Sequence, residues 1–227
     1  MSDYVLPAPA QPALPVAGTS ALFPIRRILC VGRNYAAHRR EMGGDDREPP
    51  FFFAKPADSA VSGGASVAYP SATANLHHEI ELVAALGGGG GDISPTDALS
   101  LVWGYAAGVD LTRRDLQNAA KDKGQPWEAS KGFDQSAPIG PIRRAEGAAQ
   151  PLGRIALSVN GQSRQDARLS DMIWNVAEVI AQASRLWRLA PGDLIFTGTP
   201  EGVGPLAPGD RVEGLIEEVG EVGFTIV

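Results

Sequence analysis

Glycine and proline turns divide this chain into many short segments, and most of those segments are of the β type. The sequence holds 27 glycines and 18 prolines among 227 residues. Short apolar or alternating runs lie between the turns, and Asn160–Gly161 within "RIALSVNGQSRQ" is a typical hairpin turn. Short strands at regular spacing with few helices predict an α+β, β-rich fold with mixed or antiparallel sheets, and not a doubly wound sheet.

Three segments carry patterns of longer helices. The clearest start is at Ser94, which is placed to cap the helix, with Pro95 at the first position and Asp97 closing a capping box. The last has an apolar face at helical spacing. The predicted helices cover residues 93–105, 110–124 and 175–189, with a shorter one at 34–43.

Composition excludes several classes of protein. The net charge of −6 argues against nucleic acid as a partner, because phosphate binding needs a basic surface. No apolar run approaches the ~20 residues that span a bilayer, and the first residues do not resemble a signal peptide. The one cysteine, Cys30, cannot form an internal disulfide, which fits a reducing cytoplasm.

The length suits one large domain, or a domain with a small appendage. Four prolines within residues 7–15 predict an extended start that is poor in regular structure. The expected division is therefore a Pro-rich N-terminal extension, 1–20, and a folded domain, 21–227.

The segment "NLHHEIELVAALG", residues 75–87, begins with charge and continues as an apolar strand. Residues two apart on a strand point to the same side, so His77, Glu79 and Glu81 share one face. Side by side, two carboxylates repel each other unless solvent, a lysine or a cation lies between them. An exposed sheet face would explain this pattern, and so would a divalent metal.

A third carboxylate favours the metal. Asp110 ends the nearly apolar run "LVWGYAAGVD", where a carboxylate is costly to bury unless it is paired or coordinated. Glu79, Glu81 and Asp110 would make an open site for Mg²⁺ or Mn²⁺, which prefer oxygen ligands. Zinc is less suited, because the three histidines and Cys30 show no zinc-binding spacing.

Other polar residues could complete a reaction site. His38 and Glu41 lie three apart on the short predicted helix, where a carboxylate beside an imidazole gives a general base near neutral pH. A surface pair would show the same pattern. Arg114 and Gln117 follow Asp110 at helical spacing, and Lys131 lies further on in "EASKGF". Each of these residues alone would more often be a solvated surface residue.

Six blocks occur in a characteristic order: "VGRNYAAHRREM", "FFFAKP", "NLHHEIEL", "GYAAGVDLTRRDLQ", "SKGFD" and "IFTGTPEGVG". Together they resemble the fumarylacetoacetate hydrolase family, most closely its short acylpyruvate and fumarylpyruvate hydrolase members. The resemblance covers roughly residues 25–227 and implies a roll of mixed β-sheets, usually a homodimer. Residues 21–227 would then form the catalytic domain.

The resemblance also implies roles for individual residues. The metal ligands fall on Glu79, Glu81 and Asp110, and the water-activating pair falls on His38 and Glu41. Gln117 and Lys131 match the glutamine and lysine near the reacting carbonyl. His77 departs from the aspartate often found at its position, which leaves open whether it is a ligand, a neighbour of a ligand or a structural residue.

The reaction implied is the Mg²⁺-dependent hydrolysis of a C–C bond in a 2,4-dioxo acid to pyruvate and a carboxylic acid. Arg33 is a candidate partner for a substrate carboxylate. Fumarylpyruvate is the expected substrate, because of a resemblance to the hydrolases of the gentisate pathway of aromatic catabolism.

Other functions remain as alternatives. Oxaloacetate decarboxylation and isomerisation of hydroxymuconate-type acids could use the same metal site, but they need no activated water, so the His38–Glu41 pair favours hydrolysis. A non-catalytic metal-binding module would have no need of that pair or of Lys131. The glycine run at 87–91 lacks the ending of a phosphate loop, which argues against nucleotide binding.

Overall fold

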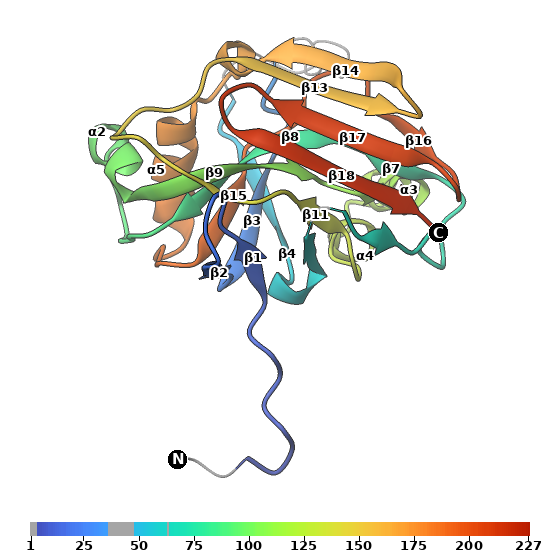
Figure 1. Cartoon of the computed structure of the whole chain (residues 1–227), viewed down its shortest axis with the longest axis horizontal. Coiled ribbons are helices and arrows are strands. Elements are labelled where there is room, and N and C mark those ends of the chain that lie inside the picture. The colour runs from blue at the N-terminus through green and yellow to red at the C-terminus, as the bar shows by residue number, and fades with distance from the viewer. Residues whose placement is uncertain (1–3, 36–47, 63) are drawn as a thin grey trace.

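The computed structural model describes residues 4–35, 48–62 and 64–227. The fold is built around two sheets that lie one above the other (Figure 1). The larger sheet runs β4 (Phe51–Lys55), β3 (Arg27–Gly32), β15 (Asp193–Phe196), β8 (Ile80–Leu86), β9 (Val102–Val109), β11 (Ala137–Ile139) and β5 (Ala60–Ser62), with β12 (Arg143–Arg144) also on β9. The second runs β14 (Gln162–Arg168), β13 (Arg154–Val159), β17 (Arg211–Ile216), β18 (Gly220–Ile226) and β6 (Ser66–Val67).

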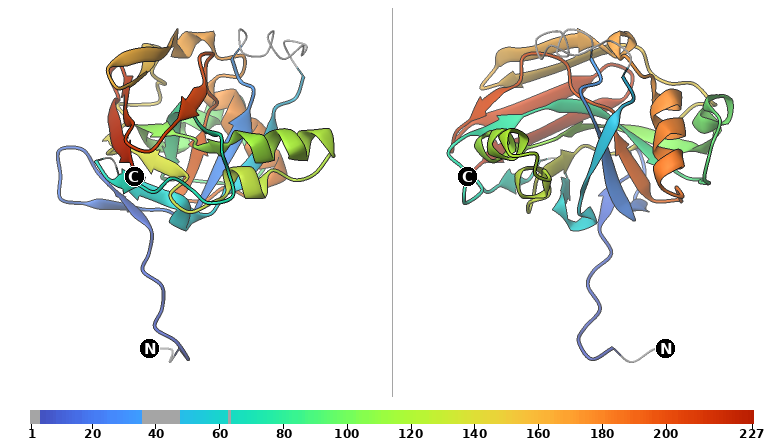
Figure 2. Two further views of the ribbon diagram at one scale, coloured as in Figure 1. Left: turned by 90° about the vertical axis from the view of Figure 1, so that its right-hand side faces the viewer. Right: turned by 180° about the vertical axis from the view of Figure 1, so that it is seen from behind.

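Smaller elements surround these two sheets. A three-stranded sheet runs β10 (Thr112–Arg113), β7 (Leu76–His78) and β16 (Gly204–Leu206), and a hairpin joins β1 (Ala13–Pro15) to β2 (Leu22–Pro24). The helix α5 (Val176–Leu186) lies at one end of the molecule, and α3 (Arg114–Asp122) and α4 (Glu128–Lys131) lie at the other (Figures 1 and 2). The remaining helical turns are α2 (Pro95–Ala98), η1 (Ala57–Ser59), η2 (Leu99–Leu101) and η3 (Leu169–Asp171).

Two apolar cores lie on opposite faces of the larger sheet. Strand β8 contributes to both, because its alternate residues point opposite ways: Leu82 packs in the core beneath the second sheet, and Val83 packs against the β1–β2 hairpin. All seven residues of β8 are therefore buried. Glu79 and Glu81 lie four and two residues before Val83, so their side chains point to the same side of the sheet, toward the hairpin.

The fold agrees with the β-rich, mixed-sheet prediction, since both parallel and antiparallel neighbours occur in the larger sheet. The Asn160–Gly161 turn is confirmed, with φ of 52° and 75° between β13 and β14. Two of the longer helices are present as α3 and α5. The helix predicted over 110–124 begins only at Arg114, because Thr112–Arg113 form strand β10 beside β7. The short helix predicted at 34–43 falls almost entirely outside the described residues.

The helix predicted over 93–105 is wrong in extent. Ser94 does cap it, accepting a hydrogen bond from the backbone N–H of Asp97, but the helical turns end at Leu101 and strand β9 begins at Val102. The capping residues determine only the first turn. Beyond it, pairing with β8 buries the apolar run on both faces, and this tertiary contact outweighs local helix propensity.

The start of the chain runs away from the body as an extended segment (Figure 2). Residues 4–12 have no regular secondary structure, and most are exposed. From Ala13 onward the chain pairs with β2, and Leu14 and Val16 are buried in the hairpin-side core. Among the described residues, no helix is long and apolar enough to cross a membrane.

Candidate metal centre and active site

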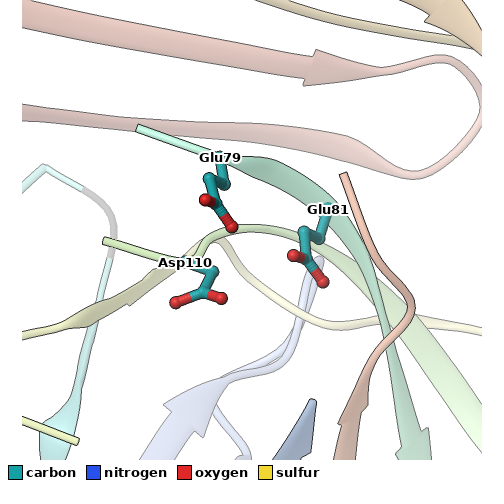
Figure 3. Close-up of side chains that lie close together, drawn as sticks. All are labelled: Glu79, Glu81 and Asp110. Carbon is teal, nitrogen blue, oxygen red and sulfur yellow. The ribbon is translucent and has the colours of Figure 1, made fainter. Parts of the chain in front are cut away.

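Three carboxylates meet at the start of β8 and the end of β9. Glu79 joins β7 to β8, Glu81 is the second residue of β8, and Asp110 directly follows β9. The two antiparallel strands fix them in register, because the Asp110 backbone N–H donates to the Glu79 carbonyl at 2.8 Å. One oxygen from each carboxylate lies within 4.8 Å of those from the other two, and the side chains converge (Figure 3). The sequence prediction that these three residues lie together is confirmed.

Burial makes this cluster electrostatically unusual. The exposed fractions are 7% for Glu79, 2% for Glu81 and 0% for Asp110. Burial, with the neighbouring charges of Asp110 and Glu79, raises the pKa of Glu81 well above its usual range. Burial would also raise the pKa of Glu79, but Lys131 and Arg114 hold it below its usual range.

Three cations neutralise two of the carboxylates. The Lys131 ammonium lies 2.8 Å from Glu79 Oε2 and 2.6 Å from Asp110 Oδ2. On the other side of Asp110, the Lys55 ammonium lies 2.8 Å from Oδ1, and Arg114 pairs with Glu79 Oε1. Both lysines are almost completely buried.

Glu81 is bound differently from the other two. Among the described residues it forms no ion pair, and its Oε2 accepts a hydrogen bond from the Gly198 backbone N–H at 2.7 Å. Gly198 has φ of 95°, and a Cβ there would lie 2.6 Å from the Asn34 side chain. Glycine is therefore needed where this backbone passes Asn34. A buried carboxylate without a cation partner, in an all-oxygen cluster, fits a hard divalent metal ion.

His77 lies beside Arg114 and outside the carboxylate cluster. Arginine can only donate, so the Arg114 Nε–H donates to His77 Nδ1 at 3.3 Å. The other ring nitrogen, Nε2, lies 2.9 Å from the Asn75 side-chain oxygen and therefore carries the proton. Burial and the Arg114 charge lower the pKa of His77 to about 4. The ring is thus neutral near pH 7 and accepts a hydrogen bond from Arg114, which pairs with Glu79.

The remaining predicted residues in the described part of the chain line one cavity with the carboxylates. The cavity has a volume of about 330 Å³ and is bordered by Arg33 after β3, Gln117 on α3 and Lys131 on α4. The side-chain oxygen of Gln117 accepts a hydrogen bond from Arg114 Nη1 at 2.5 Å. Lys131 has a third partner in Thr112 Oγ1, at 2.7 Å, so its three N–H donors are all in use. Contact between Lys131 and a substrate would require one of them to be released.

Sequence reasoning missed three contributors. Lys55 braces Asp110 from β4, and Gly198 and Thr199 border the site from the loop after β15. The signals were a lysine in the apolar run "FFFAKP" and the glycine-rich loop "FTGTPEGVG". His38 and Glu41 lie outside the described residues, so their role as a base remains a prediction.

A buried carboxylate cluster on the wall of a cavity, within a fold of several sheets, is the arrangement expected of a metal-dependent enzyme. The family model for the fumarylacetoacetate (FAA) hydrolase C-terminal region matches residues 27–227. The chain therefore belongs to the fumarylacetoacetate hydrolase family of enzymes.

Individual relatives agree with this assignment. A fumarylpyruvate hydrolase from a Ralstonia species is 46% identical over 79% of this chain and 93% of its own length. The crystal structure of a fumarylpyruvate hydrolase from Pseudomonas aeruginosa, in complex with Mn²⁺ and pyruvate, superposes with a TM-score of 0.95 at 50% identity, covering 99% of both chains. A mitochondrial oxaloacetate tautomerase from Mus musculus is 40% identical over 88% of this chain and 91% of its own length.

Proposed function

We propose that this enzyme hydrolyses a C–C bond in a 2,4-dioxo acid, either fumarylpyruvate or a related acylpyruvate, to give pyruvate and a carboxylic acid. The observation that carries the proposal is the buried cluster of Glu79, Glu81 and Asp110. The cluster lies on the wall of a cavity that is also lined by lysine and arginine side chains. The likeness to a fumarylpyruvate hydrolase crystallised with Mn²⁺ and pyruvate supports it.

Glu79, Glu81 and Asp110 would hold a divalent cation, Mg²⁺ or Mn²⁺, which when bound would act as a Lewis acid toward the developing negative charge. Gln117 and Lys131 would bind the oxygen of the carbonyl under attack. Donors placed at such an oxygen are worth ~10²–10³-fold in rate in other enzymes. His38, oriented by Glu41, would remove a proton from the attacking water. The assignment of this pair rests on the sequence.

The test is a set of reactions with metal-free protein. Fumarylpyruvate, acetylpyruvate and oxaloacetate are each mixed with the protein, with and without Mg²⁺, and the products are identified. Release of pyruvate with fumarate or acetate, only when Mg²⁺ is present, is the expected result. If neither diketo acid is cleaved, the proposal is wrong.

A second candidate function has its own support. The 40% identical oxaloacetate tautomerase suggests that this chain could act on oxaloacetate, and decarboxylation or isomerisation of similar acids belongs to the same alternative. Tautomerisation moves a proton and needs no water. Keto–enol exchange of oxaloacetate without cleavage of any diketo acid would therefore select this candidate.

The setting of the enzyme is also part of the proposal. The resemblance supports a homodimer in the cytoplasm that acts in aromatic catabolism of the gentisate type. Light scattering of the purified protein would give twice the chain mass for a dimer.

A further inference from the structure

One wall of the cavity alternates cations with aromatic rings. The guanidinium of Arg33 lies 5.9 Å from the centre of the Phe51 ring. Phe51 meets Trp127 edge to face, with ring centres 4.9 Å apart and planes at 88°. The ammonium of Lys121 lies 5.1 Å from the centre of the Trp127 ring. All four residues line the same cavity as the carboxylate cluster.

The backbone at the end of β3 has two features that position Phe51 and Arg33 in this wall. Gly32 pairs with Phe51 between β3 and β4, and a Cβ on Gly32 would lie 2.1 Å from the Phe51 ring. Only glycine lets the ring lie against β3 at this point. The next residue, Arg33, has φ of 59°, a conformation that residues other than glycine rarely adopt. Phe51 is nevertheless 39% exposed, which is unusual for a phenylalanine.

The two cations of this wall differ from the other cations of the cavity. Arg114 and Lys131 form ion pairs with the carboxylate cluster. Within the part of the chain that the structure describes, neither Arg33 nor Lys121 forms an ion pair with a carboxylate. Burial, together with the charges of Arg114 and Arg33, lowers the pKa of Lys121 to about 8. An anion bound here would relieve this repulsion.

We propose that Arg33 and Lys121 bind a terminal carboxylate on the acyl arm of the substrate, with the flat arm lying along Phe51 and Trp127. The preferred substrates would then be acylpyruvates whose acyl group is an unsaturated dicarboxylic acid. This inference rests on the proposed function and makes Lys121, Phe51 and Trp127 specificity-determining residues.

The arrangement explains how one cavity can treat the two ends of such a substrate differently. The pyruvate end goes to the carboxylate cluster, where the cations are already paired. The distal carboxylate goes to Arg33 and Lys121, which form no ion pair with a carboxylate among the described residues, and a charge-assisted hydrogen bond there is stronger than a neutral one. The aromatic rings of Phe51 and Trp127 offer flat apolar surface to the arm.

The first test compares two substrates in one variant. Lys121→Met keeps the length of the side chain and removes its charge. The hydrogen bond of a charged group is worth ~1.5–3 kcal/mol, so kcat/KM for fumarylpyruvate should fall ~10–100-fold, chiefly through KM. Acetylpyruvate has a methyl group in place of the carboxyvinyl arm, so its kcat/KM should stay within about twofold.

Lys123→Met is the matched control, because Lys123 is exposed at the end of the same helix and does not line the cavity. It should leave both substrates unaffected. Equal losses for both substrates in Lys121→Met, or no loss for either, would overturn the inference while leaving the proposed hydrolysis intact.

The second test needs no turnover. Binding of fumarate and of crotonate, which has a methyl group in place of one carboxylate, is measured by calorimetry on the Mg²⁺-loaded protein. Fumarate should bind more tightly, and the difference should disappear in Lys121→Met and in Arg33→Gln. If both acids bind wild type equally, the subsite does not exist, whatever reaction the enzyme catalyses. A preference for fumarate that needs Lys121, in a protein that cleaves no diketo acid, would support the subsite and reject the proposed function.

Discussion

At the scale of single residues, the three carboxylates have unequal surroundings although they form one cluster. Asp110 lies between Lys55 and Lys131, and Glu79 lies between Lys131 and Arg114. Within the described part of the chain, Glu81 has a backbone N–H as its partner instead of a cation. The same chemical change at different positions should therefore have opposite effects on the metal-free protein.

Glu81→Gln should stabilise the protein without metal, whereas Asp110→Asn should destabilise it. The first change removes a buried carboxylate that forms no ion pair with any described residue, and it keeps an oxygen for the Gly198 N–H. The second takes from Lys55 the carboxylate with which it pairs and leaves Lys131 paired with Glu79 alone, and breaking a buried pair costs ~3–5 kcal/mol. Thermal unfolding in the presence of a chelator measures both changes.

Both variants should also lose the rise in Tm that Mn²⁺ gives wild type, because metal bound only to the native state stabilises it. At ~2–4 °C per kcal/mol for a chain of this size, the Tm of Asp110→Asn should fall by ~6–20 °C. A fall in Tm for Glu81→Gln would contradict the account of unequal surroundings. A full Mn²⁺ response in either variant would reject that residue as a ligand.

The sequence was informative about these residues only where a local pattern marked them. Glu79 and Glu81 stand two apart on a strand, and Asp110 is a charge at the end of an apolar run, so all three could be predicted. Lys55 could not, because its burial depends on a carboxylate 55 residues away that only the sheet brings near. The role of His77 depends on the position of Arg114, which no spacing encodes.

At the scale of secondary-structure elements, one side chain links the sheets around the site. The side-chain oxygen of Gln165, on β14, accepts a hydrogen bond from the Ile80 backbone N–H and lies 3.0 Å from His78 Nδ1. Its amide group donates to Thr199 Oγ1 at 2.8 Å and to the Pro200 carbonyl at 3.0 Å. One amide thus joins the second sheet to the start of β8 and to the loop that carries Gly198.

Gln165→Leu should therefore cost both stability and activity. The change leaves several buried groups unsatisfied, at about 1–3 kcal/mol for each buried group. Turnover should fall as well, because the loop with Gly198 and Thr199 loses its anchor. Gln162→Leu is the control, since Gln162 is exposed on the same strand. Equal Tm values for the two variants would show that Gln165 does not link these elements.

Elements were predictable where local and tertiary preferences agree. Helix α5 has a capping box at Asn175 and an apolar face that meets the core, and both levels favour a helix. The segment from 93 to 105 has a helix cap at its start, but its apolar run is needed as a strand beside β8. Where the two levels disagree, the sequence pattern alone gives the wrong extent.

At the scale of the whole molecule, the N-terminal region also shows what a sequence pattern alone does not predict. Its prolines predict an extended start of 20 residues, because proline opposes regular structure wherever it occurs. The pattern does not show which of these residues are covered. In the structure residues 4–11 are exposed, whereas Leu14 has an exposed fraction of 0%. Gln11 lies at the transition, where its side-chain amide donates to the Ile25 carbonyl at 2.7 Å.

Two truncations should therefore differ sharply. Removing residues 1–10 should leave Tm within about 1 °C of the full chain, because the exposed segment contributes few buried contacts. Removing residues 1–20 also deletes β1, with Leu14 and Val16, and exposes the apolar face of the larger sheet. Losing one such large buried side chain typically costs ~2–5 kcal/mol, so Tm should fall by ~4–20 °C. Equal Tm values for the two truncations would mean that the hairpin adds nothing to the fold, and that the extension ends at residue 20 as the prolines predict.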